Sequence, residues 1–234
     1  MENKTLSVVV PCYNEGETIP FLLKRYSDTL YGRDDIEIIL VNDGSKDNTK
    51  EVLEKEKDKY SFLKVLHVEP NRGYGNAVYT GLSNAEGKYI GWTHGDMQTP
   101  PEDAIKALKI LEESKDKNLF VKGRRLKRPL ADNVFTFGMS IFESVLFGYV
   151  LYDINAQPNI FPREFLKKWE NPPKDFSLDL YALLLAKRNK MKVVRFPVIF
   201  GKRMAGVSSW NINWKSKLKF IKRTVSFSFK LRCK

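Results

Sequence analysis

Residues 6–15 read LSVVVPCYNE, and this stretch decides the fold class. Its apolar run, Leu6–Val10, is rich in β-branched residues and is followed by Pro11, a pattern typical of a short buried strand. The polar residues Tyr13, Asn14 and Glu15 come directly after it. The stretch therefore predicts a buried strand whose carboxyl end carries polar side chains.

Strand patterns of this kind recur along the chain, and helical patterns separate them. The predicted strands are Leu6–Val10, Ile36–Val41, Leu63–Val68, Lys88–Thr93 and Asn118–Lys122. The predicted helices between them are Gly16–Leu30, Asp47–Tyr60, Gly75–Ala85 and Pro100–Ser114. Strands that alternate with helices across short loops are typical of an α/β protein with a parallel, doubly wound sheet.

Such sheets bind ligands beyond the carboxyl ends of their strands. Three of the predicted strands end there in polar clusters: residues 13–15, 42–45 (Asn-Asp-Gly-Ser) and 94–98 (His-Gly-Asp-Met-Gln). Because parallel strands present these ends at one edge of the sheet, the sequence predicts a single site lined by all three clusters.

Composition and charge narrow the class of partner. The chain has 234 residues, of which 42% are hydrophobic and 29% charged, which fits a soluble globular protein and excludes a disordered one. The net charge of +12 favours an anionic partner such as nucleic acid, anionic lipid or a phosphate-bearing substrate. Ten of the 40 Lys and Arg residues follow residue 200, where no Asp or Glu occurs. Two cysteines, Cys12 and Cys233, favour a reducing compartment over a disulfide framework.

The basic C-terminal segment has the pattern of an amphipathic helix. Trp214, Leu218, Ile221 and Val225 fall on one helical face, with Lys and Arg between them, as in helices that lie on an anionic membrane. The alternative is a helix packed on the protein's own core. This concentration of charge beside an apolar face argues against nucleic acid as the partner. We expect a cytoplasmic protein that is peripheral at the membrane.

A second apolar stretch, Val134–Tyr152, is close to the length of a membrane span. It contains Glu143 together with Ser, Thr and Gly residues, and Asp153 follows at once. We therefore expect a buried or interface-lying helix there.

Five segments carry a family resemblance when they are read in order: SVVVPCYNEGETI (7–19), ILVNDGSKDNT (39–49), NRGYGNAVYTGL (71–82), KYIGWTHGDMQTPPED (88–103) and FPVIFGKRMAGVSSW (196–210). They resemble the family 2 glycosyltransferases, and within them the polyprenyl-phosphate (dolichyl-phosphate) sugar synthases. The resemblance implies a GT-A fold, that is, a Rossmann-type, mainly parallel sheet flanked by helices. It would cover residues 1–210, and residues 211–234 would form the basic amphipathic tail.

The resemblance implies a nucleotide-sugar site at the first two polar clusters. Pro11 and Tyr13 would shape the base pocket, while Glu15 and Asp43 would accept hydrogen bonds from the base and the ribose. The alternative for residues 43–45 is a tight turn with a helix cap. In the Gly-rich residues 71–76, Arg72 or the helix N-terminus would lie near phosphate; the alternative is a plain loop before a helix.

The third cluster predicts a metal site. On an extended chain, residues two apart point to one face, so Asp96 and Gln98 would both offer oxygen to one Mg²⁺ or Mn²⁺. The donor diphosphate would complete the coordination. His94 stands where the family usually has the first Asp of Asp-x-Asp; it can donate a hydrogen bond and ligates Mn²⁺ better than Mg²⁺. The alternative is that His94 marks an enzyme that has lost its activity.

The acceptor side is predicted farther along the chain. Residues 121–129 form a basic loop after the fifth strand, from which Arg124 or Arg125 would clamp an anionic acceptor. Asp153 matches an Asp that the family places beside the acceptor, where it would act as general base. A phosphate acceptor is already anionic at neutral pH and hardly needs one. Asp175 and Asp179 are alternative carboxylates, with helix capping as the competing interpretation.

The last motif, Arg-x-x-Gly-x-Ser, places Arg203 against the donor diphosphate, Gly206 in a turn and Ser208 beside phosphate. The alternative is a basic linker into the tail.

Together these features predict an inverting, metal-dependent transfer of a sugar from a nucleotide diphosphate to an acceptor, most simply polyprenyl phosphate. Transfer to a glycan hydroxyl and non-catalytic binding of a nucleotide sugar are the competing hypotheses.

Overall fold

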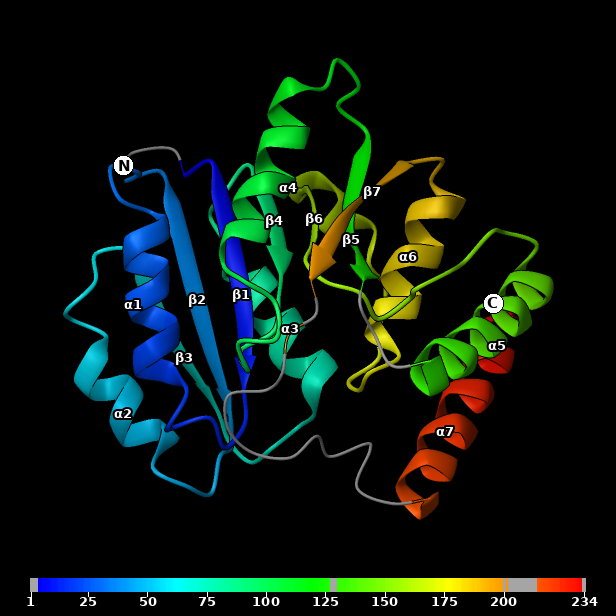
Figure 1. Cartoon of the computed structure of the whole chain (residues 1–234), viewed down its shortest axis with the longest axis horizontal. Coiled ribbons are helices and arrows are strands. Elements are labelled where there is room, and N and C mark those ends of the chain that lie inside the picture. The colour runs from blue at the N-terminus through cyan, green and yellow to red at the C-terminus, as the bar shows by residue number, and fades with distance from the viewer. Residues whose placement is uncertain (1–3, 127–129, 200, 202–213, 233–234) are drawn as a thin grey trace.

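The computed structural model describes residues 4–126, 130–199, 201 and 214–232, with the backbone alone for residues 130–135 and 214–220. Within these ranges one sheet is formed by β1 (Leu6–Cys12), β2 (Ile36–Asp43), β3 (Leu63–Val68), β4 (Tyr89–Trp92), β5 (Leu119–Leu126), β6 (Asn159–Pro162) and β7 (Lys192–Ile199). The strand order is β3-β2-β1-β4-β6-β5-β7 (Figure 1). Only β6 runs antiparallel to its neighbours among these strands, so the predicted mainly parallel sheet is confirmed.

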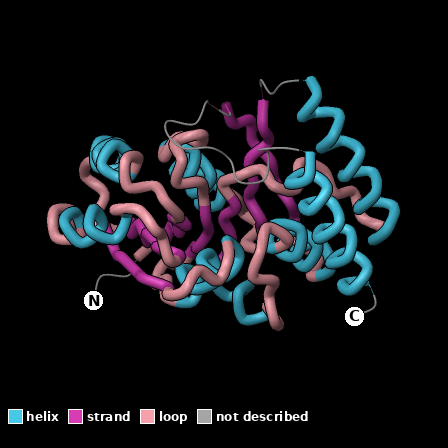
Figure 2. The backbone as a smooth tube through the Cα atoms, turned by 90° about the horizontal axis from the view of Figure 1, so that it is seen from below, coloured by secondary structure: helices cyan, strands magenta, loops and turns pink. Residues whose placement is uncertain are grey.

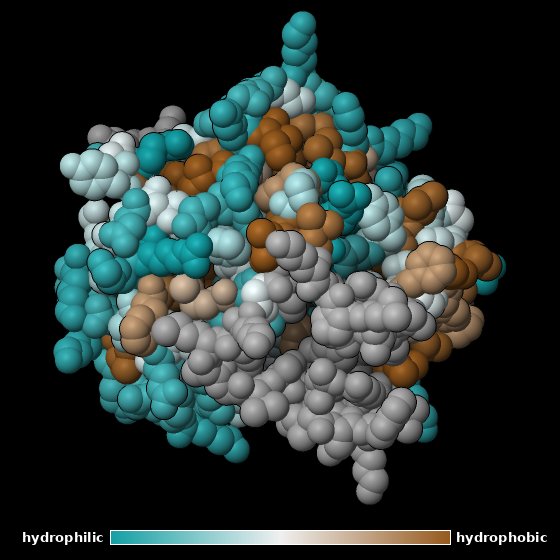
Figure 3. Space-filling view, viewed as in Figure 1, coloured by the Kyte–Doolittle hydropathy of each residue, from teal (hydrophilic) through white to brown (hydrophobic). Residues whose placement is uncertain are grey.

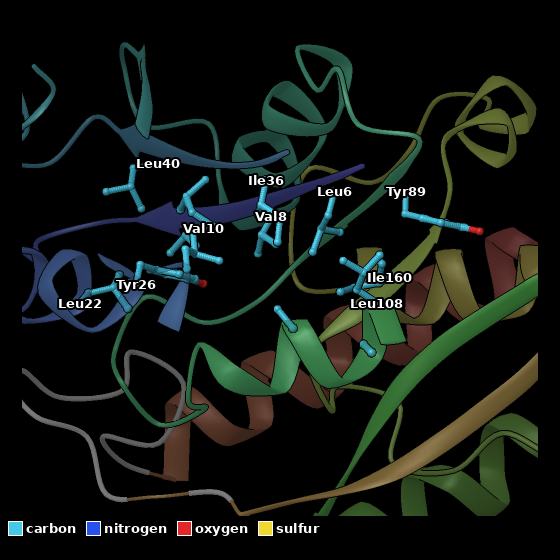
Figure 4. Packing of buried hydrophobic residues seen from close by; sticks show 14 of the residues in the cluster. Leu6, Val8, Val10, Leu22, Tyr26, Ile36, Leu40, Tyr89, Leu108 and Ile160 are labelled. Carbon is cyan, nitrogen blue, oxygen red and sulfur yellow. The ribbon is translucent and has the colours of Figure 1, made fainter. Parts of the chain in front are cut away.

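Helices cover both faces of this sheet. They are α1 (Ile19–Thr29), α2 (Thr49–Glu56), α3 (Tyr74–Ser83), α4 (Glu102–Glu113), α5 (Leu130–Phe147), α6 (Leu178–Arg188) and α7 (Trp214–Arg232), with a 3₁₀ helix, η1, at Arg163–Lys168. Apolar side chains of α1, α2 and α4 pack on one face of the sheet, and those of α3 and α6 pack on the other. Figure 4 shows the first layer, in which Leu22 and Tyr26 of α1 lie against Val8 and Val10 of β1.

β1 continues past the proline at which the sequence pattern predicts its end. Pro11 and Cys12 remain paired with Val41 and Asn42 of β2. On the other edge, the pairing of β1 with β4 stops at Val9, opposite Trp92. Because the missing N–H of Pro11 faces an edge without a ladder, the proline costs no sheet hydrogen bond and the strand runs on.

The second half of β5 corrects the predicted basic loop. Gly123 to Leu126 are strand residues that pair with Phe196 to Ile199 of β7, so Arg124 and Arg125 project from a strand rather than from a loop. Neither β6 nor β7 was predicted from the sequence. β6 has only four residues, and its position between β4 and β5 depends on contacts that no local pattern records.

α5 and α7 form a pair at one side of the molecule, seen at the lower right of Figure 1 and again side by side in Figure 2. α5 ends at Phe147, before the predicted end at Tyr152. Gly148 closes the helix with a positive φ of 71° and an N–H bond to the Ser144 carbonyl. Among the described residues, no helix is both long enough and apolar enough to cross a bilayer.

The C-terminal helix packs on the protein rather than extending away from it. Leu231 belongs to the core layer under α3 and α6, and Ser228 is fully buried against α5. Ile221 and Val225, two residues of the predicted apolar face, are half-buried. Trp214 and Leu218, the other two, have side chains outside the described residues.

Candidate active site

The loops that follow β1 and β2 are joined by hydrogen bonds. The Asn14 N–H donates to Ser45 Oγ at 3.0 Å, and the Lys46 N–H donates to Asn14 Oδ1 at 2.8 Å. The Glu15 N–H donates to Thr49 Oγ1 at 2.9 Å, which leaves the Glu15 side chain nearly buried beside an exposed Tyr13. The structure thus brings Pro11, Tyr13 and Glu15 to the same edge of the sheet as Asp43.

Asp43 organises the Gly-rich segment that follows β3. Its carboxylate accepts hydrogen bonds from the N–H groups of Arg72, at 2.9 Å, and Gly73, at 2.8 Å, and its own carbonyl accepts one from the Asn71 side chain. A carboxylate has about four lone-pair sites, so two of them remain to accept bonds from a ligand. Asp43 therefore fixes the start of α3 from the end of β2.

The glycines of this segment are required by a neighbouring loop. A Cβ at Gly73, whose φ is +99°, would lie 2.5 Å from the Lys174 carbonyl oxygen. A Cβ at Gly75 would lie 2.3 Å from the Pro173 carbonyl oxygen. These glycines let the start of α3 pack against the backbone of residues 173–175, which accounts for them without an approach to phosphate.

The third polar cluster is bent, so its predicted extended conformation is wrong. β4 ends at Trp92, Met97 has a φ of +61°, and the Gln98 N–H donates to Asp96 Oδ1 at 3.1 Å. The Thr93 and Thr99 hydroxyls close the loop at 3.0 Å. The loop packs at Gly95 against Val10 and Pro11, with His94 half-buried beside it.

Gln98 is tied to the segment that enters the last predicted motif. Its Nε2 donates to the Gly201 carbonyl at 3.2 Å, and the Gly201 N–H donates to the Gln98 carbonyl at 2.8 Å. Arg203, Gly206 and Ser208 themselves lie outside the described residues.

The donor set fits a metal held partly by substrate. Across the described ranges, no three His, Cys, Asp or Glu side chains lie close enough together to hold an ion. Asp96, nearly buried at this edge of the sheet, offers one carboxylate. Mg²⁺ is usually bound by one or two carboxylates together with substrate phosphates rather than by an all-protein cage. Asp96 and a diphosphate are therefore a chemically suitable set.

An ion pair marks the predicted acceptor side. The Arg125 guanidinium donates to Asp153 Oδ1, 2.7 Å from Nε, and the Arg125 N–H donates to Asp153 Oδ2 at 2.7 Å. Burial opposes the charge of Asp153, but Arg125 outweighs it and holds the pKa of this carboxyl below its usual range. Asp153 is thus a carboxylate fixed by a cation, and Arg124 next to Arg125 is exposed.

A buried polar network, which the sequence analysis did not identify, lies beneath this pair. Lys122 Nζ is fully buried and donates to Asn159 Oδ1 at 2.8 Å and to the Ala156 carbonyl. Asn159 Nδ2 donates to Asp179 Oδ1 at 3.2 Å. Burial lowers the pKa of Lys122 to about 7 and raises that of Asp179. The one signal of this network in the sequence was a lysine, Lys122, that ends an apolar strand pattern.

The same network reaches the donor side. Gln157 Nε2 donates to the Tyr74 hydroxyl at 2.6 Å, so the first residue of α3 contacts the segment that carries Asp153. Asp179 is buried here, whereas Asp175 accepts the Ser177 N–H at 2.8 Å just before α6 and pairs with Arg223 of α7 at 3.1 Å. Of the two alternative carboxylates, only Asp179 belongs to the network, and neither makes a side-chain cap bond to α6.

The one ionisable side chain of β1, the Cys12 thiol, is inert. Burial, with Glu15 adding to it, raises the pKa of the Cys12 thiol, so the thiol stays protonated and does not serve as a nucleophile.

Residues 7–167 match the family model described as "Glycosyl transferase family 2". The chain belongs to glycosyl transferase family 2. The UDP-N-acetylglucosamine–dolichyl-phosphate N-acetylglucosaminyltransferase of Methanococcus voltae is 30% identical over 223 residues, which cover 85% of this chain and 86% of the relative. A dolichyl-phosphate beta-glucosyltransferase of Dictyostelium discoideum is 27% identical and covers 85% of this chain and 67% of its own length.

Solved structures confirm the predicted GT-A class of this family 2 glycosyltransferase. A mannosyltransferase from Pyrobaculum calidifontis, in complex with GDP-Man and Mn²⁺, superposes with a TM-score of 0.70 at 20% identity and covers 98% of this chain and 65% of its own. The glucosyl-3-phosphoglycerate synthase of Mycobacterium tuberculosis, in complex with Mn²⁺ and UDP, gives 0.73 at 18% identity, with coverages of 98% and 80%.

Proposed function

We propose that this family 2 glycosyltransferase moves a sugar from a nucleotide diphosphate to polyprenyl phosphate, with inversion at the anomeric carbon. The observation that carries the choice of acceptor is the Arg125–Asp153 ion pair. A carboxylate whose pKa is lowered is a weak base, and a sugar hydroxyl would need a stronger one. A phosphate monoester, with a second pKa of about 6, is already a nucleophile at neutral pH. The names of the two dolichyl-phosphate relatives support the same acceptor.

In this proposal the residues divide between donor and acceptor. Glu15 and Asp43 hold base and ribose at the ends of β1 and β2, with Tyr13 and Pro11 beside them. Arg124, exposed at the end of β5, attracts the lipid phosphate, whose oxygen forms the new bond to the anomeric carbon as the bond to the nucleoside diphosphate breaks. Arg203 and Ser208 of the late motif would contact the diphosphate.

We assign the metal to Asp96 and to the side-chain oxygen of Gln98, whose backbone N–H also bonds to the Asp96 carboxylate. Mg²⁺ or Mn²⁺ bound there would neutralise charge on the departing nucleoside diphosphate. The Mn²⁺ complexes of the two solved structures support this assignment.

The lipid acceptor also implies a location. An enzyme of this kind would work at the cytoplasmic face of a membrane, as a peripheral protein.

The test incubates the protein with labelled nucleotide sugars and detergent-solubilised undecaprenyl or dolichyl phosphate. We expect a labelled lipid whose formation stops in excess EDTA. The matched controls are the unphosphorylated polyprenols and a soluble oligosaccharide. Transfer to either control, with none to the phosphate, would overturn the proposed acceptor. Absence of transfer from every donor would support the non-catalytic alternative raised by His94.

A further inference from the structure

The outer face of α5 is apolar and exposed. Phe137, Ile141 and Val145 are spaced four residues apart and therefore form one stripe along the helix. Phe137 has 67% of its surface exposed and Val145 has 80%. Val150, just beyond the end of the helix, is also exposed. Figure 3 shows hydrophobic surface at this right-hand side of the molecule.

α7 extends the stripe and adds charge. Phe229 is half-exposed, and its ring lies 6.1 Å from that of Phe142 in α5. Lys222, Lys230 and Arg232 of α7 are exposed, and the chain has no acidic residue after residue 200. An apolar stripe bordered by cations has the chemistry of an interface with anionic lipid.

The single charge between Val134 and Tyr152 is turned away from this face. Glu143 is fully buried between the two helices, where Ser228 Oγ donates to its Oε1 at 2.7 Å. Burial raises the pKa of Glu143 to about 7. From Phe137 to Val145, where the side chains of α5 are described, the exposed stripe therefore carries no carboxylate that would repel an anionic surface.

The position of α5 relates the stripe to the acceptor side. The chain leaves the sheet at Leu126, next to Arg124 and Arg125, and α5 follows. After α5 the chain returns to Arg125 through Asp153. Both ends of this excursion thus lie beside Arg124, the residue to which the proposed function assigns the lipid phosphate.

We propose that the α5 stripe, bordered by the basic residues of α7, docks on an anionic membrane and presents the acceptor side to lipid-borne phosphate. This inference rests on the proposed function for its biological meaning. It differs from an anchor in the C-terminal tail alone, because buried Ser228 and Leu231 use α7 for packing and α5 supplies the apolar contact.

The experiment compares the wild type with the double variant Phe137→Asp/Val145→Asp by co-sedimentation with phosphatidylcholine vesicles, with and without phosphatidylglycerol. Both sites are exposed, so circular dichroism and melting temperature should not change. We expect vesicle affinity to fall by about tenfold or more. The matched control is Tyr31→Asp, which should bind as the wild type does. Tyr31 is 92% exposed and follows α1 closely in sequence, and α1 lies on the opposite side of Figure 1 from α5 and α7.

Two further variants separate the electrostatic contribution to vesicle binding from the apolar one. Lys222→Ala/Lys230→Ala should lose the preference for phosphatidylglycerol, and salt should have the same effect on the wild type. Val145→Cys in a Cys233→Ser background, labelled with a polarity-sensitive dye, should shift to the blue on anionic vesicles, whereas Tyr31→Cys should not.

Three outcomes would overturn the docking surface: a wild type that binds no vesicle, a double variant that binds as well as the wild type, or a double variant whose only change is a lost dimer. Transfer to detergent-solubilised polyprenyl phosphate is measured in parallel and should be unaltered by the double variant. Failure of that transfer in the wild type would count against the proposed function. It would not affect the conclusion on membrane docking, which the vesicle experiment tests separately.

Discussion

In this proposal the metal is bound by the carboxylate of Asp96, so metal-dependent activity requires that residue. We expect Asp96→Asn to lower transfer by at least about 100-fold, because the developing charge on the leaving diphosphate would lose its counter-ion. Gln98→Ala should have a smaller effect, since its backbone N–H still bonds to Asp96. Turnover measured across a Mn²⁺ titration checks both. An Asp96→Asn enzyme that keeps full activity in EDTA would remove the metal from this site.

Asp153 is a positioning residue if the acceptor is a phosphate. Asp153→Asn should lower kcat by up to about 100-fold through displacement of Arg125, as small misplacements can do. The acid limb of the pH–rate profile should stay near pH 6 in the variant, because it reports the acceptor phosphate. Disappearance of that limb in Asp153→Asn would instead identify Asp153 as the general base.

The start of α3 depends on the absence of a side chain at Gly75. An added Cβ would meet the backbone oxygens of Pro173 and Asp175 at 2.3 and 2.6 Å, and neither can move independently of its loop. We expect Gly75→Ala to destabilise the protein by about 1–3 kcal/mol in denaturant unfolding.

Gly138 of α5 is the matched control, because a Cβ there would have no neighbour within 4 Å. Gly138→Ala should stabilise the protein by about 0.4–1 kcal/mol. Equal effects of the two substitutions would contradict the packing role assigned to Gly75.

The contact between α5 and α7 makes stability depend on pH. The pKa of Glu143 is raised from 4.5 to about 7, so the folded protein holds a proton that the unfolded chain has released in this range. The free energy of unfolding should therefore fall as pH rises from about 4.5 to 7, by up to about 1.4 kcal/mol per unit, and level off above.

Glu143→Gln should remove that dependence. We expect it to raise the melting temperature at pH 8 and to have little effect at pH 4, measured by thermal unfolding. A variant that is less stable than the wild type at pH 8 would show that the carboxylate is stabilising, contrary to this account.

At the scale of the whole molecule, local pattern predicted the part of the sheet built by simple alternation. Five strands and four helices up to residue 122 lie where hydrophobic runs indicate them, with ends displaced by a few residues. The end of β1 was predicted too early, at Pro11. Whether a proline ends a strand depends on which of its edges is paired, and no sequence pattern shows that.

The remainder of the sheet and part of the site depend on tertiary contacts. β6 is a four-residue strand fixed by its neighbours on both sides. The polar clusters predicted that residues 13–15, 42–45 and 94–98 share one edge of the sheet, and the parallel pairing of β1, β2 and β4 brings them there. The Lys122–Asn159–Asp179 network joins residues far apart in sequence. The choice between Arg124 and Arg125 for the acceptor also depends on a tertiary contact, because Asp153 engages Arg125 and Arg124 stays exposed.

The Arg125–Asp153 ion pair joins the two ends of the segment that leaves the sheet after Leu126 and comes back to it at Asp153. A segment whose two ends meet at one ion pair can be exchanged as a unit, provided that the buried Leu151 of the core and the Glu143 contact with Ser228 of α7 are retained. Exchanging the exposed positions between residues 127 and 150 among relatives should therefore alter which lipid surface is recognised while the nucleotide side stays as it is. Diversification of such enzymes could proceed by substituting this segment, without rebuilding the architecture that holds the donor.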